Sequence, residues 1–399
     1  MKHLLVALAL PLAIAASPRR LAAADAAGKP PNVIYILADD LGYGDISCLN
    51  KNSKIPTPNI DRLAAEGISF TDAHSASAVC TPTRYGVLTG RYCWRTSLKK
   101  GVLYGYSPPL IEPTRMTVAS LLKQHGYDTA CIGKWHLGLT WARKDGVAAG
   151  KLAENGEDVD FTKPIKGGPT ELGFDHFYGI SASLDMPPYT YIENARVVKL
   201  PTEQAGKGEF GRAGLKAPGF EAVNVLPDLT KKAVEFIDGH AADKPARPFF
   251  LYFPVNAPHT PIAPADMAKG KSQAGKYGDF VAEVDWTVGE VMKCLERNKL
   301  GANTLLIVTS DNGSSPHGFP EEDVKKYDHQ TSYHFRGRKS DAWDGGHHIP
   351  FIARWPGKVK AGSVSDEIIC LNDLMATCAA LVGAKLPDGA GEDSYNILP

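Results

Sequence analysis

Four oxygen-bearing side chains stand in two pairs, each directly after an apolar run of strand length, and they are Asp39, Asp40, Asp311 and Asn312. Carboxylate and amide oxygens are the ligands that hard cations prefer, and no cysteine or paired histidine lies beside them in the sequence. The pattern therefore predicts a site for Ca²⁺, with Mg²⁺ as the alternative. Asp and Asn also cap helices and turns, so either pair alone leaves that structural interpretation open. Two pairs in equivalent positions favour the metal site.

One cysteine stands in a setting suited to an anionic nucleophile or an anionic ligand. Cys80 begins the segment Cys-Thr-Pro-Thr-Arg, in which Pro82 is suited to the first turn of a helix. A group at a helix start lies near the positive end of the helix dipole, and Arg84 would add positive charge beside it. A lone cysteine is more often a small buried apolar residue. The residues of this segment leave both interpretations open.

Several motifs together resemble the type I sulfatase family. The segment from Cys80 to Arg84, followed by Leu-Thr-Gly-Arg at residues 88–91, is similar to the family signature. In that family a maturation enzyme oxidises the motif cysteine to formylglycine, whose hydrated aldehyde attacks sulfur. Further motifs follow in the family's order, at residues 32–45 (NVIYILADDLGYGD), 133–138 (GKWHLG), 256–261 (NAPHTP), 310–313 (SDNG), and 338–339 with 344–346. A single short motif is moderately specific, whereas this ordered set is very specific.

The resemblance implies a role for each matching residue. Cleavage of a sulfate ester needs an in-line nucleophile, positive charge around the sulfate oxygens and a proton for the leaving alcohol. By resemblance, the cation held by the two pairs contacts the oxidised form of Cys80 and the sulfate, and Arg84 stabilises the hydrated aldehyde. The remaining roles are sulfate binding by Lys134 and Lys339, proton acceptance by His136, and protonation of the leaving alcohol by His259 with Lys339.

Each of these assignments has a structural alternative. Isolated lysines are usually solvated and histidines are often structural, so the interpretation of Lys134, Lys339, His136 and His259 depends on their motifs. Ser183 corresponds to a hydroxyl that contacts sulfate in some family members, and a serine in a turn is the alternative.

Apolar segments of strand length alternate with segments of helical periodicity from Pro30 onward. The predicted strands are residues 32–38, 129–132, 249–253, 304–309 and 351–354, and the predicted helices are residues 58–66, 117–125, 229–237, 280–297 and 373–382. This alternation predicts an α/β fold with a mostly parallel sheet sandwiched by helices, in which ligands bind at the carboxyl ends of the strands. The resemblance implies the alkaline phosphatase/sulfatase form of this fold. Residues 142–168 and 201–219 are polar and predict long insertions or rims.

The composition and the N-terminus indicate an exported enzyme. The chain of 399 residues carries 44 basic and 44 acidic side chains, and this balance argues against a nucleic acid partner or an anionic membrane surface. Residues 1–24 are typical of a signal peptide, with cleavage near Ala16 or near Ala24, and an uncleaved anchor is the alternative. The apolar run 4–16 is shorter than the ~20 residues that span a bilayer. We therefore expect a catalytic domain over residues 30–399, secreted or periplasmic, with no stable membrane span after cleavage.

Three features qualify this interpretation. Apart from Cys80, the chain has six cysteines that could form up to three disulfides, although free buried thiols are favoured for most of them. His348 stands where the family usually has an arginine, so a titratable group replaces a permanent cation. The chain ends at Pro399, where family members continue into a smaller C-terminal subdomain, so that subdomain is expected to be missing from a fragment or a naturally short enzyme.

The sequence thus predicts a sulfuric ester hydrolase that acts on a sulfated carbohydrate or similar sulfate ester after a formylglycine-generating maturation enzyme has converted Cys80. Two alternatives are a phosphonate or phosphate monoester hydrolase of the same superfamily and an inactive protein that binds sulfated glycans. Specificity is expected to depend on loops at residues 185–191 and 317–334, which no sequence rule translates into a particular sugar.

Overall fold

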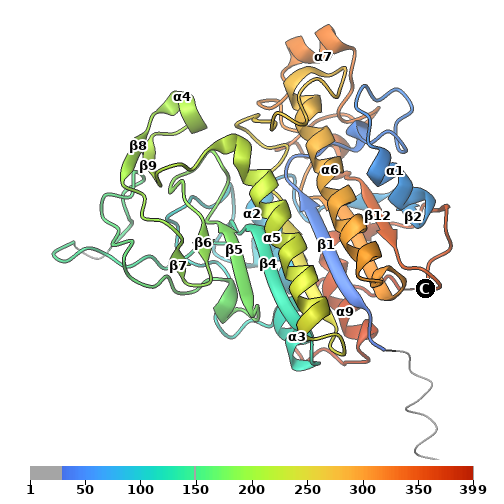
Figure 1. Cartoon of the computed structure of the whole chain (residues 1–399), viewed down its shortest axis with the longest axis horizontal. Helices are drawn as coiled ribbons and strands as arrows, with labels where there is room; N and C mark the ends of the chain where they lie inside the picture. Colours follow the sequence, from blue (N-terminus) through green and yellow to red (C-terminus); the bar gives the residue numbers. More distant parts are fainter. Residues whose placement is uncertain (1–28, 148–149, 399) are drawn as a thin grey trace, which may run out of the picture. The chain divides into compact units, whose positions relative to one another are not determined.

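A sheet of ten strands forms the centre of the fold (Figure 1). The computed structural model describes residues 29–147 and 150–398, and the predicted signal peptide, residues 1–24, lies outside them. The helices and strands all belong to one unit, Pro31–Pro399. The strand order is β13-β2-β12-β11-β1-β10-β4-β5-β6-β7. Their bounds are Ser363–Ser365 (β13), Ile68–Phe70 (β2), Phe351–Arg354 (β12), Thr304–Ser310 (β11), Asn32–Ala38 (β1), Phe249–Pro254 (β10), Asp128–Lys134 (β4), His176–Ile180 (β5), Ile192–Glu193 (β6) and Arg196–Val197 (β7).

The five central strands β11, β1, β10, β4 and β5 are parallel to one another. Strand β12 runs antiparallel to β11 and β2, and β6 and β7 continue the other edge in antiparallel pairs. The predicted α/β fold with a mostly parallel sheet is therefore confirmed. Because the central strands are parallel, all their carboxyl ends meet at one edge of the sheet.

Helices cover both faces of the sheet, so β1 is buried on both sides and reads as a continuous apolar run. One core contains Ile34 and Ile36 of β1, and it is covered by α1 (Pro58–Ala65), α5 (Ala222–Asp243) and α6 (Gly275–Arg297). The other core contains the alternate residues Val33, Tyr35 and Leu37, and it is covered by α2 (Cys80–Thr89), α3 (Val118–Gln124) and α9 (Leu374–Leu381). Figure 1 shows α5 and α6 side by side across one face of the sheet.

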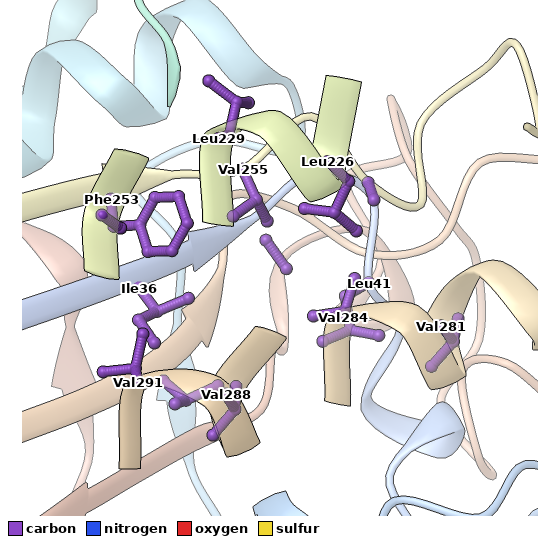
Figure 2. Close-up of a cluster of buried hydrophobic side chains, with 14 of the residues drawn as sticks. Ile36, Leu41, Leu226, Leu229, Phe253, Val255, Val281, Val284, Val288 and Val291 are labelled. Carbon is purple, nitrogen blue, oxygen red and sulfur yellow. The ribbon is translucent and has the colours of Figure 1, made fainter. Parts of the chain in front are cut away.

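The core beneath α5 and α6 holds the centre of the sheet in place (Figure 2). Ile36 of β1 and Phe253 of β10 lie among side chains that the two helices supply, which include Leu226, Leu229, Val284, Val288 and Val291. These side chains are essentially inaccessible to solvent. Full burial of such a side chain contributes about 1.5–3 kcal/mol. The strand ends that follow this core are therefore firmly positioned.

The remaining elements lie mostly in connections and at the sheet edges. The predicted rim 201–219 contains the hairpin of β8 (Glu203–Ala205) and β9 (Gly214–Lys216) with the short helix α4 (Lys207–Phe210) between them. Helix α5 is longer at both ends than the predicted residues 229–237 and accommodates Pro227 near its start. The other elements are β3 (Ala73–His74), β14 (Ile369–Cys370), α7 (Glu321–Tyr327) and α8 (Asp344–His347), with 3₁₀ turns at Tyr43–Asp45, Cys93–Arg95, Pro169–Glu171, Gly301–Asn303 and Leu371–Asp373.

The seven cysteines are all free thiols in the described part of the chain. Five are buried, Cys370 is half-buried and Cys48 is exposed, so the favoured interpretation of free thiols agrees with the structure. Among residues 29–147 and 150–398, no helix is both long and apolar enough to cross a bilayer.

Candidate active site

The predicted site residues gather at the carboxyl ends of the five central strands. Two oxygen-ligand pairs follow β1 and β11, which are direct neighbours in the sheet. Lys134 ends β4, and His136 and His259 follow β4 and β10. Cys80 and Arg84 come from the first turns of α2. The neighbouring parallel strands β1 and β11 thus bring together Asp40 and Asp311, which are 271 positions apart in the sequence.

Asp39, Asp40, Cys80 and His259 form a compact buried group. One ligand atom from each lies within 4.8 Å of the others. The second pair joins them, because the Asp40 amide donates to Asp311 Oδ1 at 3.2 Å and Asn312 Nδ2 donates to Asp40 Oδ1 at 2.7 Å. The four predicted metal ligands therefore converge on one point.

Two acceptors in this group have no hydrogen-bond partner among the described residues. They are Asp39 Oδ1 and Asn312 Oδ1, and both side chains are fully buried. A buried acceptor without a partner costs about 1–3 kcal/mol. Hard oxygen atoms from three carboxylates and one amide are a donor set that suits Ca²⁺ or Mg²⁺. The residues present therefore fit a divalent cation.

Asp40 occupies an uncommon backbone conformation, with φ of +69°. Asp tolerates the left-handed region better than most residues, although the conformation still has an energetic cost. The neighbouring backbone stabilises this turn, since the Asp39 amide donates to the Ala257 carbonyl and the Leu41 amide donates to Ser310 Oγ, both at 3.0 Å. The turn directs both carboxylates of the first pair into the group.

Two lysines lie against the first pair of carboxylates. Lys134 Nζ donates to Asp39 Oδ2 at 2.6 Å, and Lys339 Nζ lies 2.6 Å from Asp40 Oδ1. Burial opposes ionisation of Asp39, but the positive charges nearby, led by Lys134, outweigh it and hold the pKa of this carboxyl well below its usual range. Asp39 is therefore an anionic carboxylate at neutral pH.

Arg84 is fully buried and binds the second pair. Its Nε and Nη2 atoms donate to Asp311 Oδ2 at 3.1 and 2.7 Å, and its Nη1 donates to the Lys134 carbonyl at 3.0 Å. Burial and the neighbouring charge of Asp39 nevertheless raise the pKa of Asp311 to about 7. Crowded carboxylates of this kind are stabilised by a cation between them.

Removing Arg84 should destabilise the fold strongly, because Asp311 would remain buried without its partner. We expect Arg84→Ala to lower the free energy of unfolding by about 3–5 kcal/mol, measured by denaturant titration in the presence of a chelator. Arg297→Ala is the matched control. Arg297 forms a half-exposed ion pair with Asp238, so its loss should cost about 1 kcal/mol or less. Equal losses in the two variants would contradict the argument.

Cys80 occupies the first position of α2, after the extended residue Val79. Its side chain is buried, and burial raises the pKa of the thiol, although the positive charges of Lys134 and Lys339 counteract part of this effect. The thiol is therefore protonated at neutral pH, whereas a nucleophilic cysteine must be a thiolate. The position suits a nucleophile, but the unmodified side chain does not.

His136 has the features of a proton acceptor. Its Nε2 donates to the Leu103 carbonyl at 2.7 Å, which leaves Nδ1 as an unprotonated, buried atom without a partner among the described residues. Burial first, and then the charges of Lys134 and Arg84, hold the pKa of His136 well below its usual range. Its backbone is left-handed, with φ of +56°, between the buried side chains of Trp135 and Leu137. The surrounding core therefore enforces this orientation.

His259 presents its other nitrogen to the site. Its Nδ1 donates to the Thr260 carbonyl at 2.7 Å, and its Nε2 lies 3.8 Å from Asp40 Oδ2. Burial lowers the pKa of His259, and the charge of Lys339 lowers it further. An imidazolium at Nε2 would therefore be a stronger acid than in water.

Ser183 lies buried on the loop that follows β5, the fifth central strand. Its hydroxyl and that of Ser181 have no hydrogen-bond partner among the described residues. Asn256 is fully buried, and its side-chain Oδ1 and Nδ2 atoms likewise have no hydrogen-bond partner among the described residues. The backbone on either side of it is fixed, because the Val255 amide donates to the Leu37 carbonyl of β1 and the Ala257 carbonyl accepts from the Asp39 amide. No sequence motif predicted a role for Ser181 or for the Asn256 side chain. Asn256 stands just after the predicted strand 249–253, and this position is the signal that could have identified it; the strand before Ser181 was not predicted.

His348 does not join this group. Its Nε2 donates to the Thr71 carbonyl at 2.7 Å, its ring stacks on Phe335, and Asp72 Oδ1 lies 4.0 Å from its Nδ1. Burial lowers the pKa of His348, so it is neutral near pH 7 and does not supply the positive charge of the family's usual arginine. With Asp72 and His74 it forms a separate cluster of potential ligands.

Comparison with known proteins identifies the family. The family model described as Sulfatase matches residues 31–384. The chain belongs to the sulfatase family. An N-acetylgalactosamine-6-O-sulfatase of Bacteroides thetaiotaomicron is 36% identical to this sulfatase. The alignment covers 93% of the present chain and 76% of that relative. A human steryl-sulfatase is 32% identical over 94% of the chain and 70% of that relative. The prediction of a sulfuric ester hydrolase is thereby confirmed at the level of the family.

The fold of this sulfatase also matches that of solved relatives. One such structure, of a protein described with the metabolism of multiple glycosaminoglycans by Bacteroides thetaiotaomicron, superposes with a TM-score of 0.81 at 34% identity. The match covers 93% of this sulfatase and 81% of that chain. The two named sequence relatives carry the names of an amino sugar and a steryl substrate. Membership of the sulfatase family therefore leaves the alcohol part of the ester to be decided.

Proposed function

We propose that this sulfatase hydrolyses sulfate esters of carbohydrates, with a formylglycine made from Cys80 and a divalent cation held by Asp39, Asp40, Asp311 and Asn312. The position of Cys80 is the observation that carries the proposal. It starts a helix within 4.8 Å of the first carboxylate pair and His259, although its buried thiol is protonated. Oxidation to formylglycine would supply at that point a hydrated aldehyde as the nucleophile toward sulfur.

The cation would supply positive charge to the nucleophile and to a sulfate oxygen. Lys134 and Lys339 already lie at this point with their ammonium groups against the carboxylates, so they are placed to neutralise the remaining sulfate oxygens. Ser183, with its unpartnered hydroxyl, is a further candidate for contact with sulfate. Arg84 would stabilise the nucleophile from the side of Asp311.

The two proton transfers fall to two histidines, of which His136 would begin the cycle neutral and His259 protonated. His136 offers a free lone pair at Nδ1, because its Nε2–H is bound by the Leu103 carbonyl, so it would accept the proton that accompanies release of sulfate. His259 would donate a proton from Nε2 to the leaving alcohol, since its lowered pKa makes the protonated ring a ready acid. The two roles require opposite protonation states at the start of the cycle.

The carbohydrate part of the proposal is supported by the relative named for N-acetylgalactosamine 6-O-sulfate. The proposal includes export through residues 1–24, with a catalytic domain over residues 30–399 in the periplasm or outside the cell. It also includes a formylglycine-generating maturation enzyme as the partner that activates Cys80. Ca²⁺ is the preferred ion, because the donor set is rich in oxygen and charge.

The proposal is tested with protein co-expressed with a maturation enzyme and supplied with Ca²⁺. We expect free sulfate to be released from sulfated monosaccharides, and kcat/KM for an aryl sulfate to exceed that for the matched aryl phosphonate. Peptide mass analysis should show that Cys80 has lost its thiol and gained an aldehyde. A preference for the phosphonate would instead support a phosphonate hydrolase. Binding of sulfated glycans without turnover, with Cys80 unconverted, would support a glycan-binding protein.

A further inference from the structure

We propose that a pocket beside the candidate active site binds a second sugar of the substrate, one that carries a carboxylate or sulfate, through Tyr104 and Arg212. This inference rests on the proposed function and extends it from a single sulfated sugar to an anionic oligosaccharide. The pocket has a volume of about 540 Å³, within the range of small-molecule sites. Its lining includes Tyr104, Trp141, Arg143, Lys151, Met186 and Arg212.

The pocket is built by chain segments that leave the candidate active site. Tyr104 follows Leu103, whose carbonyl accepts from His136 Nε2 and whose amide donates to Thr81 Oγ1 at 3.1 Å, next to Cys80. Trp141 lies on the segment that continues from His136.

A third segment comes from Ser183. The amide of Met186, which lines the pocket, donates to the Ser183 carbonyl at 2.9 Å. Three segments thus connect the pocket with the candidate active site, and we place in this pocket the neighbouring sugar of a substrate whose sulfate ester binds at Cys80.

The charge of the lining favours an anion. Three cationic side chains, Arg143, Lys151 and Arg212, line the pocket together with the carboxylate of Glu154. Asp185 pairs with Arg212 and Glu154 with Lys151, so one positive charge is left over. The chain as a whole carries balanced charge, so this excess is local. A guanidinium can bind a carboxylate or a sulfate through two parallel hydrogen bonds. Arg212 contacts Asp185 through Nη1, which leaves its Nε and Nη2 atoms to bind either group.

The pocket also offers a surface for a sugar ring. Tyr104 is 44% exposed, although tyrosine usually buries most of its ring, and the Arg212 guanidinium lies over this ring at 5.4 Å from its centre. A sugar presents apolar C–H faces together with polar hydroxyls, so an aromatic face beside a guanidinium matches both parts.

Both groups are held in place before a ligand binds. The Arg212 guanidinium contacts the Asp185 carboxylate, and the Arg212 carbonyl accepts from the Tyr189 hydroxyl at 2.6 Å. The Tyr104 amide donates to Ser107 Oγ at 2.8 Å, and Trp141 Nε1 donates to the Gly105 carbonyl at 2.9 Å. A site with positioned side chains loses less entropy on binding than a mobile loop does.

The test uses the mature, metal-loaded enzyme and compares two substrates. One is a sulfated monosaccharide, and the other is a disaccharide in which the same sulfated sugar is joined to a uronic acid. We expect Arg212→Gln and Tyr104→Ala each to lower the ratio of kcat/KM for the disaccharide to that for the monosaccharide by about ten- to a hundredfold, mainly through KM. Arg297→Gln, on the distant surface of α6, is the matched control and should leave the ratio unchanged. A disaccharide with a neutral second sugar should lose its sensitivity to Arg212→Gln but keep that to Tyr104→Ala.

An unchanged ratio of kcat/KM in both variants would overturn the proposal. An equal loss of kcat/KM on the two substrates would also overturn it, because Arg212 would then act only by positioning Asp185. If the wild-type enzyme turns over neither substrate, the proposed function fails while the pocket remains testable. In that case, calorimetry of the disaccharide with the Cys80→Ala protein should show binding that Arg212→Gln weakens by about tenfold or more. Equal affinity of the two proteins would overturn the pocket as well.

Discussion

Replacing Cys80 with alanine should abolish sulfate release, with kcat lowered by at least about a thousandfold, because no other group at this point of the site can become the nucleophile. The carboxylates around Cys80 form ion pairs with the neighbouring lysine and arginine side chains, so neither set is free to act as a nucleophile. The measurement is the rate of sulfate release at a saturating concentration of one sulfated substrate, with protein that has been co-expressed with the maturation enzyme.

The effect must be separated from damage to the fold. Cys80 is a small buried residue at a helix start, so its alanine variant should keep the wild-type melting temperature within a few degrees. Cys48→Ala is the matched control, because Cys48 is exposed and lies outside the site. It should keep full activity. Undiminished sulfate release by Cys80→Ala would exclude the formylglycine mechanism.

Removal of the divalent cation should reduce activity to background and lower the stability of the protein. The site contains three carboxylates, of which Asp39 and Asp311 are fully buried and share Arg84, and binding of an ion to the folded state alone adds free energy of unfolding. At a Ca²⁺ concentration a hundredfold above Kd, this stabilisation is about 2.7 kcal/mol. The measurements are sulfate release and thermal unfolding after chelation, followed by addition of Ca²⁺ or Mg²⁺.

Variants of the ligands make the prediction specific. Asp39→Asn should remove most of the stabilisation by Ca²⁺. The substitution removes the negative charge of a proposed ligand whose Oδ1 atom has no hydrogen-bond partner among the described residues and is therefore available to the ion. Asp238→Asn, which alters a surface carboxylate on α5, should leave the response to Ca²⁺ intact. Full activity in excess chelator, or equal stabilisation of wild type and Asp39→Asn, would contradict the proposed metal site.

The framework of this site was predictable because its signals are local and periodic. Residues 32–38 and 304–309 are apolar without alternation, which is typical of strands buried on both faces, and the structure places them side by side. The rule that parallel strands end at a common edge then brings Asp39 and Asp311 together without knowledge of any distance. The motifs around Cys80 and His136 added the family, which comparison with known sulfatases confirms.

Other features depend on contacts that short segments do not encode. The four residues of β12 predict a strand, but its antiparallel direction follows from the path of the chain before it. The acceptor for His136 Nε2 is a backbone carbonyl 33 residues away, at Leu103, and no side-chain pattern marks it. The left-handed backbone of His136 likewise depends on the packing of its two neighbours. The pocket around Arg212 requires three loops to meet, so it was visible only in three dimensions.

The parallel strands that carry the candidate active site lie at the centre of the sheet, with hydrogen-bonded neighbours on both sides and helices over both faces. The amides of β1 and β10 can therefore exchange with solvent only when much of the domain opens, whereas the loops around Tyr104 and Arg212 can open locally. Mutations in those loops leave the most protected strands untouched. The architecture thus separates the part that must remain constant for catalysis from the part that selection can vary, and new glycan preferences can evolve in the loops while the reaction itself is retained.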